Sequence, residues 1–325
     1  MKLRVAVVFG GRSGEHEVSL RSAESVMRAL RREKYEILEF FISPEGKWRP
    51  CPILPEPGAN PGIDVVFPVL HGTFGEDGTM QGLFELADLP YVGPGVLASS
   101  VSMDKEVTKR LCRERGLPVV EWVTLYRGNL DPAAALQAFE FPMFVKPANL
   151  GSSVGISKAH DEAELAQALE LATRYDRKVI VERCIAGAEL ECSVLGNEDP
   201  IASAPCEILP SREFYDYEDK YLLDRAQFRL PADLPAAEME QVRQLAIGCY
   251  QATGCEGMAR VDFLREAASG VTYINEINTI PGFTSISMYP KMWEYSGIPY
   301  PDLLDRLIEC ALARHRAKMA TRFTR

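Results

Sequence analysis

Carboxylate and amide side chains gather on two neighbouring segments near the C-terminal end of the sequence. Residues 258–266 and 271–278 are rich in β-branched and aromatic residues, which predicts two strands. The segment between them, Ala-Ala-Ser-Gly, has the composition of a hairpin turn with glycine near its end. We therefore expect an antiparallel hairpin in which the polar side chains of both strands come together.

Alternation along this hairpin places polar groups on one face. Alternate side chains of a strand point to the same side, so Arg260 and Asp262 share one face of the first strand. Ile274, Glu276 and Asn278 likewise share one face of the second. If Asp262 lies opposite Glu276, then Arg260 lies opposite Asn278. Two carboxylates and a carboxamide are hard oxygen donors that suit Mg²⁺ better than a softer metal. The alternative is an exposed, charged sheet face, but like charges directly opposite one another are unfavourable without a cation between them.

The N-terminal third has the pattern of a small α/β unit. Residues 3–9 form a near-continuous apolar run, typical of a buried parallel strand, and a glycine-rich loop and a helix over 18–34 follow. Further strands are expected over 36–42 and 63–70. The glycines fit neither the G-x-G-x-x-G dinucleotide pattern nor a Walker P-loop, which disfavours an NAD-dependent oxidoreductase.

Polar residues follow the first and third of these strands. A ligand crevice at the carboxyl ends of the strands would collect Glu15 and His71. His71 could equally be a capping or packing histidine. Glu76 and Asp77 are expected to start a helix over 79–87, by capping and through the helix dipole, rather than to take part in chemistry.

A glycine- and serine-rich loop in the middle third is a candidate anion-binding loop. A strand over 142–146 ends at Lys146, and PANLGSSVG follows before a short strand over 155–158. Such a loop can offer backbone amides and hydroxyls to an anion, with Lys146 as a point charge. A plain hairpin turn is the alternative; it accounts for Gly151 but not for a lysine at the end of a strand with a buried pattern.

The remaining pattern predicts regular elements separated by two irregular segments. Residues 182–189 would cross between two domains, where Glu189 could bind ribose hydroxyls or could be a surface residue. Residues 211–229 are polar and aromatic without a clean period and suit an ordered loop or lid, with Lys220-Tyr221 its most conspicuous pair. Helices are expected over 105–115 (with Asp104 as N-cap), 132–139, 161–175, 235–253 and 301–317, and strands over 119–125, 178–184 and 189–195.

Composition limits the class of protein. The chain of 325 residues is 46% apolar and 25% charged, as expected for a globular protein of two or three domains. A net charge of −10 gives no reason to expect a nucleic-acid or membrane partner. The eight cysteines include no C-x₂-C pair, which disfavours zinc and a disulfide framework. The N-terminal apolar run is too short for a signal peptide, and we expect a cytoplasmic protein.

Seven segments, in order from about residue 3 to 313, resemble the D-alanine–D-alanine ligases of the ATP-grasp superfamily: VFGGRSGEHEVSL, HGTFGEDGTMQG, MDKEVTKRL, VKPANLGSSVGI, YDYEDKY, RVDF and NEINTIPGFTSIS. The resemblance implies an α/β (α+β) fold of three domains. These would be an N-terminal Rossmann-like pre-ATP-grasp domain over 1–103 and two ATP-grasp subdomains over 104–187 and 188–325.

The resemblance also implies an activity. Such enzymes join two D-alanine molecules at the expense of ATP, through a D-alanyl phosphate, to supply a peptidoglycan precursor. The expected ligands are ATP, D-alanine and two Mg²⁺ or Mn²⁺ ions, and relatives are usually homodimers. The alternatives are a D-alanine–D-lactate ligase, which typically lacks the lid pair found here at Lys220-Tyr221, and a non-catalytic nucleotide-binding protein, which usually lacks a metal ligand.

Carried over position by position, the resemblance implies roles for individual residues. The metal ligands would be Asp262, Glu276 and Asn278. ATP would contact Lys105, Lys146, Ser152, Ser153, Glu182, Ile185, Glu189 and Lys220. Glu15 would receive the ammonium group of the first substrate and be linked to Ser152 and Tyr221, with His71 nearby. Arg260 and the Gly282 amide would stabilise the oxyanion, and Ser287 and Met288 would border the second substrate. Arg183-Cys184 and Met288 depart from the more usual residues of the family.

Overall fold

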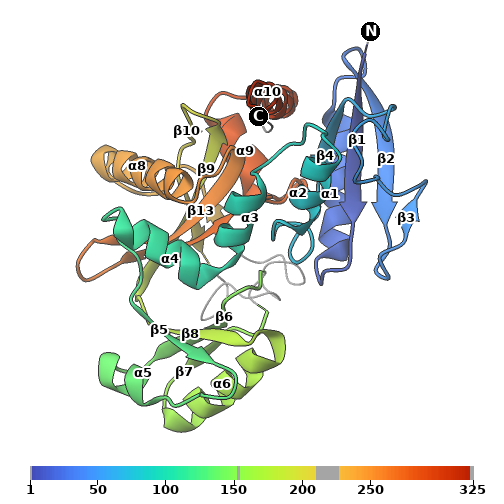
Figure 1. Ribbon diagram of the computed structural model, residues 1–325. Coiled ribbons are helices and arrows are strands. Elements are labelled where there is room, and N and C mark those ends of the chain that lie inside the picture. The colour runs from blue at the N-terminus through green and yellow to red at the C-terminus, as the bar shows by residue number, and fades with distance from the viewer. Residues whose placement is uncertain (1, 152–153, 210–226, 323–325) are drawn as a thin grey trace.

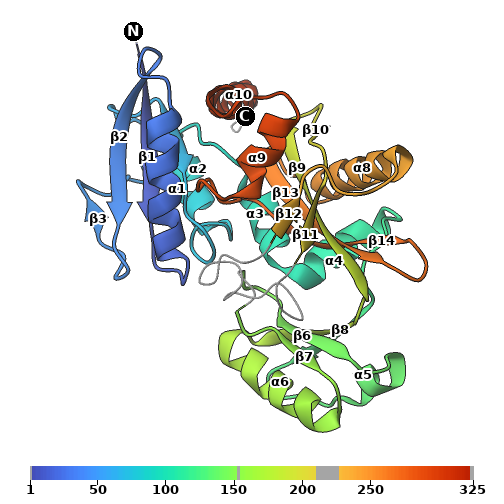
Figure 2. The same cartoon turned by 180° about the vertical axis from the view of Figure 1, so that it is seen from behind.

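The computed structural model describes residues 2–151, 154–209 and 227–322. These ranges form three β-sheets with helices packed on them (Figure 1). The central sheet and its helices lie apart from the other two sheets in both views (Figure 2). None of the helices in the described ranges has the length and apolar character needed to cross a membrane.

The N-terminal sheet is mostly parallel, as its apolar runs predict. Its strand order is β3-β2-β1-β4, and β1 pairs in parallel with both β2 and β4. Residues 5–8 of β1 are fully buried. The strands are β1 Leu3–Gly10, β2 Tyr35–Ile42, β3 Trp48–Arg49 and β4 Val65–Pro68, and the helices that follow are α1 His16–Ala29, α2 Thr79–Leu86 and α3 Val96–Met103.

The central sheet is antiparallel, with strand order β5-β8-β6-β7. Apolar residues of α6 pack against it and close a separate core that includes Met143, Val145 and Leu165. The elements are β5 Trp122–Tyr126, α5 Ala133–Ala138, β6 Met143–Pro147, β7 Ser157–Ala159, α6 Glu162–Tyr175 and β8 Lys178–Arg183. The helix that precedes them, α4 Lys105–Glu114, packs on α3, α8 and β14, and its Lys109 also contacts Glu182 of β8 in this sheet.

The C-terminal sheet has the order β12-β11-β9-β13-β14, with β10 paired to β9. The chain passes from the central sheet to this one between Arg183, the last residue of β8, and Gly187, the first of β9. That residues 182–189 cross between two domains stays a prediction. The strands are β9 Gly187–Gly196, β10 Ile201–Ala202, β11 Cys206–Leu209, β12 Gln227–Arg229, β13 Gly257–Glu266 and β14 Thr272–Asn278, and the helices are α8 Ala236–Ala252, α9 Met288–Tyr295 and α10 Tyr300–Met319.

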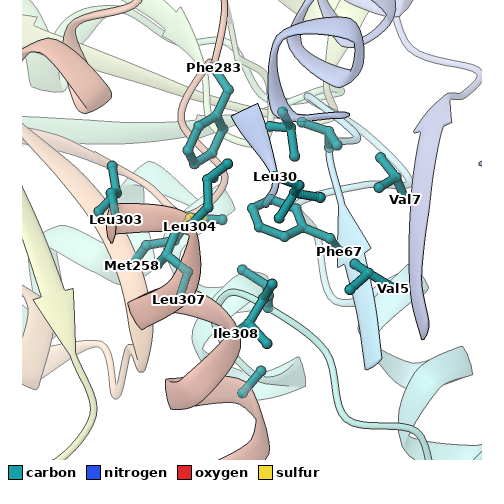
Figure 3. Close-up of a cluster of buried hydrophobic side chains, with 14 of the residues drawn as sticks. Val5, Val7, Leu30, Phe67, Met258, Phe283, Leu303, Leu304, Leu307 and Ile308 are labelled. Atoms are coloured by element: carbon teal, nitrogen blue, oxygen red, sulfur yellow. The ribbon is translucent and has the colours of Figure 1, made fainter. Parts of the chain in front are cut away.

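One apolar cluster joins the N-terminal sheet to the C-terminal part of the chain (Figure 3). In it Val5 and Phe67 of the sheet lie in the same core as Leu304 and Ile308 of α10. The two parts therefore share a hydrophobic core. The predicted division of the chain at 103/104 and 187/188 stays a prediction.

Ion pairs join the same two parts. Asp305 of α10 accepts hydrogen bonds from Arg31, from Lys34 at 2.6 Å and from the Tyr35 hydroxyl at 2.7 Å. Burial alone would raise the pKa of Asp305, but the three donors outweigh it and hold the pKa below its ordinary value. This carboxylate is therefore ionised in the folded protein at neutral pH.

Several short elements differ from the predictions. The last residues of the predicted loop over 211–229 form the edge strand β12, which pairs with β11. Helix α3 was not predicted because its buried face includes Ser99 and Ser102, which weakens the apolar period. Helix α9 was not predicted because Pro290 lies in its first turn, where proline is tolerated but is easily taken for a helix breaker.

Candidate active site

The hairpin has the predicted register. Asp262 pairs with Glu276 and Arg260 with Asn278. The next pair is Phe263 with Ile274, so Asn275 has no partner on the opposite strand. This extra residue is a β-bulge, and it shifts the register of the remaining pairs. The prediction that Ile274 shares a face with Glu276 is therefore wrong: Ile274 is buried in the apolar core, whereas Glu276 lines a cavity.

Arg260 is held by two carboxylates. Its Nε and Nη2 donate to the two oxygens of Asp262 at 2.7 and 2.6 Å, and Nε lies 3.3 Å from Glu191 of β9. Burial alone would lower the pKa of Arg260, but Asp262 and Glu191 raise it well above its ordinary value. The guanidinium is thus charged and fixed in orientation, and Arg260 lines the cavity.

The hairpin side chains fit a hard divalent cation. The Oδ1 atom of Asn278 is buried and has no hydrogen-bond partner within the described ranges. A buried polar atom is rarely left without a hydrogen-bond partner. Asn278 lies two residues after Glu276 on the same strand, so one cation could contact both side chains. The described residues include no cluster of three or more histidine, cysteine, aspartate or glutamate side chains that could hold a metal ion. A cation at the hairpin would therefore be bound by two carboxylates and the amide oxygen of Asn278.

Lys105 connects the hairpin to the candidate anion-binding loop. It is the first residue of α4, and Asp104 caps this helix as predicted by accepting from the Val107 amide. The Lys105 Nζ lies 3.0 Å from Glu276 Oε2 and donates to the Leu150 carbonyl at 2.8 Å. One buried lysine therefore contacts a candidate metal ligand and a backbone carbonyl within the predicted loop.

Lys146 lies at the end of β6 and is also buried. Its Nζ donates to Asn275 Oδ1 at 3.0 Å and lies 2.6 Å from Glu182 Oε2. The bulged residue Asn275 therefore orients this lysine, and sequence reasoning missed it because a bulge has no local signature here.

The predicted adenine and ribose residues lie outside the cavity. Glu182 is buried on β8, and its carboxylate contacts two lysines instead of lying open to a ligand. Ile185 is buried in the link between β8 and β9, and Glu189 is on β9. Lys105, Arg260, Glu276 and Asn278 line one cavity, whereas Asp262 and Lys146 do not belong to its lining. Glu182, Ile185 and Glu189 lie at the junction of the central and C-terminal sheets.

Glu15 precedes α1 and lines the cavity next to two glycines. A Cβ atom at Gly72 would lie 2.6 Å from Glu15 Oε2, and one at Gly151 would lie 3.4 Å away. Glycine is favoured at position 72 because its φ of +76° is strained for other residues, and a Cβ atom there would also require the Glu15 carboxylate to shift. Two loops far apart in sequence thus approach the same carboxylate.

His71 and Glu76 hold the loops around Glu15. The Nδ1 atom of His71 is 2.9 Å from the Ile280 carbonyl and Nε2 is 3.0 Å from Ser22 Oγ, so both ring nitrogens have internal partners although the residue lines the cavity. Glu76 does not start the next helix as predicted. It is buried and accepts from the Gly72 and Ile280 amides, and burial raises its pKa well above the ordinary value. Asp77 does accept from the first amide of α2.

Gly282 and Ser287 lie together on the loop after β14. A Cβ atom at Gly282 would lie 2.6 Å from Ser287 Oγ. The Ser287 hydroxyl also accepts from the Thr284 amide at 3.0 Å, and Met288 begins α9 beside it. The glycine therefore allows its backbone to approach the serine closely.

Nine of the fourteen predicted site residues that lie within the described ranges line one cavity of about 500 Å³. Its lining includes Glu15, His71, Lys105, Gly151, Glu191, Arg260, Glu276, Asn278, Gly282, Ser287 and Met288. Ser152, Ser153, Lys220 and Tyr221 lie outside the described residues, so their roles stay predictions. Glu191 was missed, although the alternation Glu189, Glu191, Ser193 along β9 was a signal that one face of this strand is polar.

The sequence matches two family models. The model described as "D-ala D-ala ligase C-terminus" matches residues 111–309, and "D-ala D-ala ligase N-terminus" matches 4–55 and 54–94. The chain is 69% identical over 325 residues, and over all of both sequences, to the D-alanine–D-alanine ligase of Solibacter usitatus. It is 49% identical to the D-alanine–D-alanine ligase of Thermoanaerobacter sp. strain X514, with 98% of each sequence covered.

Solved structures give the same result. The D-alanine–D-alanine ligase of Coxiella burnetii superposes with a TM-score of 0.88 at 40% identity, covering 98% of this chain and 96% of that one. The VanG D-Ala:D-Ser ligase of Enterococcus faecalis superposes with a TM-score of 0.87 at 36% identity, covering 96% and 100%. The fold is that of ATP-grasp enzymes, as predicted. This chain belongs to the D-alanine–D-alanine ligase family.

Proposed function

We propose that this protein is an ATP-dependent ligase that joins two molecules of D-alanine. The observation that carries the proposal is the composition of the cavity. It is lined at once by Glu15, which can bind an ammonium group, and by Arg260 and Lys105, which can bind carboxylate and phosphate oxygens. An amino acid and a phosphate donor both need such partners. The match to the family over the whole chain supports the same reaction.

In the first step, a carboxylate oxygen of the first D-alanine attacks the γ-phosphorus of ATP, and ADP leaves. Glu15 would hold the ammonium group of this substrate, and Arg260 its carboxylate. Lys105 and Lys146 would offset negative charge on the phosphates, with Lys220 of the lid as a further proposed contact. When bound, two divalent ions on Asp262, Glu276 and Asn278 would neutralise further phosphate charge.

In the second step, the amine of the second D-alanine attacks the carbonyl carbon of the acyl phosphate. The amine loses a proton, and the tetrahedral intermediate expels phosphate to form the peptide bond. The guanidinium of Arg260 and the Gly282 amide are the proposed donors to the developing oxyanion. The bidentate contact with Asp262 supports this role, because it fixes the guanidinium before the reaction begins.

Other contacts remain proposals at the level of single residues. Ile185 and Glu189 would border adenine and ribose, and Ser287 and Met288 the second substrate. Ser152, Ser153 and Tyr221 would complete the first-substrate site with Glu15. His71 is proposed to position this site rather than to exchange protons, because both of its ring nitrogens have internal partners and burial lowers its pKa.

The test is a phosphate-release assay with ATP, Mg²⁺ and D-alanine, in which each component is omitted in turn. We expect release to require all three, and D-alanyl-D-alanine to be identified by mass spectrometry. D-serine and D-lactate, each supplied together with D-alanine, test the alternative products. Release that is independent of D-alanine, or a product without an amide bond, would overturn the proposal.

We further propose a cytoplasmic protein that supplies peptidoglycan synthesis and acts as a homodimer. Leu86 at the end of α2 and Leu97 in α3 are 64% and 73% exposed, and the two helices pack together. Exposed leucines on neighbouring helices suit a contact between subunits. Light scattering tests this part, and a monomer at micromolar concentration would contradict it.

A further inference from the structure

Lys109 is a buried lysine that the proposed reaction does not use. It lies one turn after Lys105 in α4, and its side chain is only 1% exposed. Its Nζ donates to the Val120 carbonyl at 3.0 Å and lies 2.7 Å from Glu182 Oε1. A buried ammonium group is unfavourable unless it is paired, so the contact with Glu182 explains how this charge is tolerated.

The same carboxylate is shared with Lys146. The second oxygen of Glu182 lies 2.6 Å from Lys146 Nζ, which also donates to Asn275. Burial alone would raise the pKa of Glu182, but the two lysines lower it below the ordinary value, so the carboxylate is ionised. One negative charge thus lies between two positive charges, and the cluster carries a net charge of about +1.

This balance determines what Lys146 can offer to an anion. A lysine that faces a carboxylate of its own forms a neutral pair and attracts a phosphate weakly. With Lys109 on the other oxygen of Glu182, the cluster of three residues keeps one positive charge in excess, in a buried environment where charges are poorly screened. The carboxylates of Glu276 and Glu189 also act on Lys146, but more weakly than Glu182. The field at Lys146 therefore depends on Lys109.

The cluster also connects separate parts of the fold. Lys109 is carried by α4, which packs on α8 and β14, whereas Glu182 and Lys146 belong to the central sheet. Asn275 belongs to the C-terminal sheet. Lys109 therefore holds Glu182, and through it Lys146, in place relative to the hairpin.

We propose that Lys109 is a positioning residue of the nucleotide site, which holds Glu182 and so keeps the charge of Lys146 available to a nucleotide phosphate. The proposal rests on the proposed function, since the phosphate contact of Lys146 comes from the family. In this proposal Lys109 does not contact the nucleotide, and it strengthens nucleotide binding through Glu182 and Lys146.

The test compares the binding of ADP with Mg²⁺ to wild type and to Lys109→Met, by calorimetry. Loss of the uncompensated charge is expected to weaken ADP about tenfold, which corresponds to about 1.4 kcal/mol. The KM for D-alanine is expected to stay within about twofold, because a loss confined to nucleotide binding leaves the amino-acid contacts intact. A merely structural role would change both.

Lys34→Met is the matched control. It also removes a lysine from a carboxylate, Asp305, that keeps other partners, and it is expected to leave ADP binding unchanged. The double variant Lys109→Met with Glu182→Gln removes one charge of each sign and restores the net charge of +1. It is expected to recover at least half of the lost binding free energy, and it decides the matter if the single variant does not fold.

Two results would overturn the proposal: equal ADP affinity in wild type and Lys109→Met, or no recovery in the double variant. These are distinct from failure of the proposed function. If wild type binds ADP but its phosphate release ignores D-alanine, the reaction is wrong, and the Lys109 comparison still stands on ADP binding alone.

Discussion

Replacing Arg260 by lysine separates the charge of this residue from its geometry. Arginine has five N–H donors in a planar fork, and two of its nitrogens bind Asp262 in the structure. Three N–H groups remain on a residue that lines the cavity. Lysine has three N–H groups in total, so holding Asp262 and approaching Glu191 leaves at most one for a substrate oxygen.

The expected loss of turnover in Arg260→Lys follows from this count of N–H donors. Loss of one charged donor at an oxyanion typically lowers kcat by about 10²- to 10³-fold, or about 2.7–4 kcal/mol of transition-state stabilisation. Folding stability should change far less, by about 1 kcal/mol, because the positive charge between the two carboxylates is retained. Activity and stability are therefore expected to separate in Arg260→Lys.

Arg265→Lys is the matched control for this variant. Arg265 lies on the same strand and contacts Glu238 through Nε at 2.8 Å and Nη2 at 2.7 Å, but it does not line the cavity. We expect both variants to unfold at similar temperatures and only Arg260→Lys to lose steady-state turnover with saturating ATP and D-alanine. If Arg260→Lys kept kcat within about threefold of wild type, the role of its geometry would be refuted.

Three further predictions concern other parts of the chain. Asn278→Leu removes a buried oxygen that has no hydrogen-bond partner among the described residues, and it is expected to raise the Mg²⁺ concentration for half-maximal turnover at least ~10-fold; an unchanged Mg²⁺ titration would contradict a metal contact. Gly282→Ala places a Cβ atom 2.6 Å from Ser287 Oγ and should raise the KM for D-alanine about tenfold, whereas normal kinetics would show that the serine can move without loss. Asp305→Asn is expected to lower the free energy of unfolding in urea by about 2 kcal/mol at pH 7, since partly exposed partners reduce the cost of breaking a buried pair. Because the pKa of Asp305 is lowered by folding, its contribution is complete above about pH 4 and diminishes as the pH falls further, so a difference from wild type that is undiminished between about pH 4 and pH 2 would contradict the assignment.

Sequence patterns within a single strand, turn or helix end were enough to predict much of the hairpin and of the N-terminal sheet. Alternation and one turn were enough to pair Asp262 with Glu276, because the period of a strand fixes which side chains share a face. The cap at Asp104 and the parallel strand β1 were equally local. Ile274 was misplaced because a bulge resets the alternation, and nothing within the hairpin marks where it occurs.

Contacts between distant segments could not be predicted. Glu76 has the sequence position of a helix start, yet its oxygens bind amides of two separate loops, one of them after β14. Glu182 was assigned to the nucleotide from its position in a family pattern, whereas its partners Lys109 and Lys146 are identified only by the packing of α4 against the sheets. Tertiary structure decides which buried charges are neighbours, and periodicity contains no such information.

The N-terminal sheet and α10 share one hydrophobic core, and this limits which fragments and chimaeras of the chain can fold. Val5 and Phe67 lie in one cluster with Leu304 and Ile308, so a gene fragment for the N-terminal sheet alone would encode a protein with a bare apolar face (Figure 3). A chimaera that exchanges this sheet between relatives must also exchange α10. The segment from β5 to β8 is different, because α6 closes its core within the same stretch of chain. This segment can be exchanged between relatives as one unit, whereas the N-terminal sheet and α10 must be exchanged together.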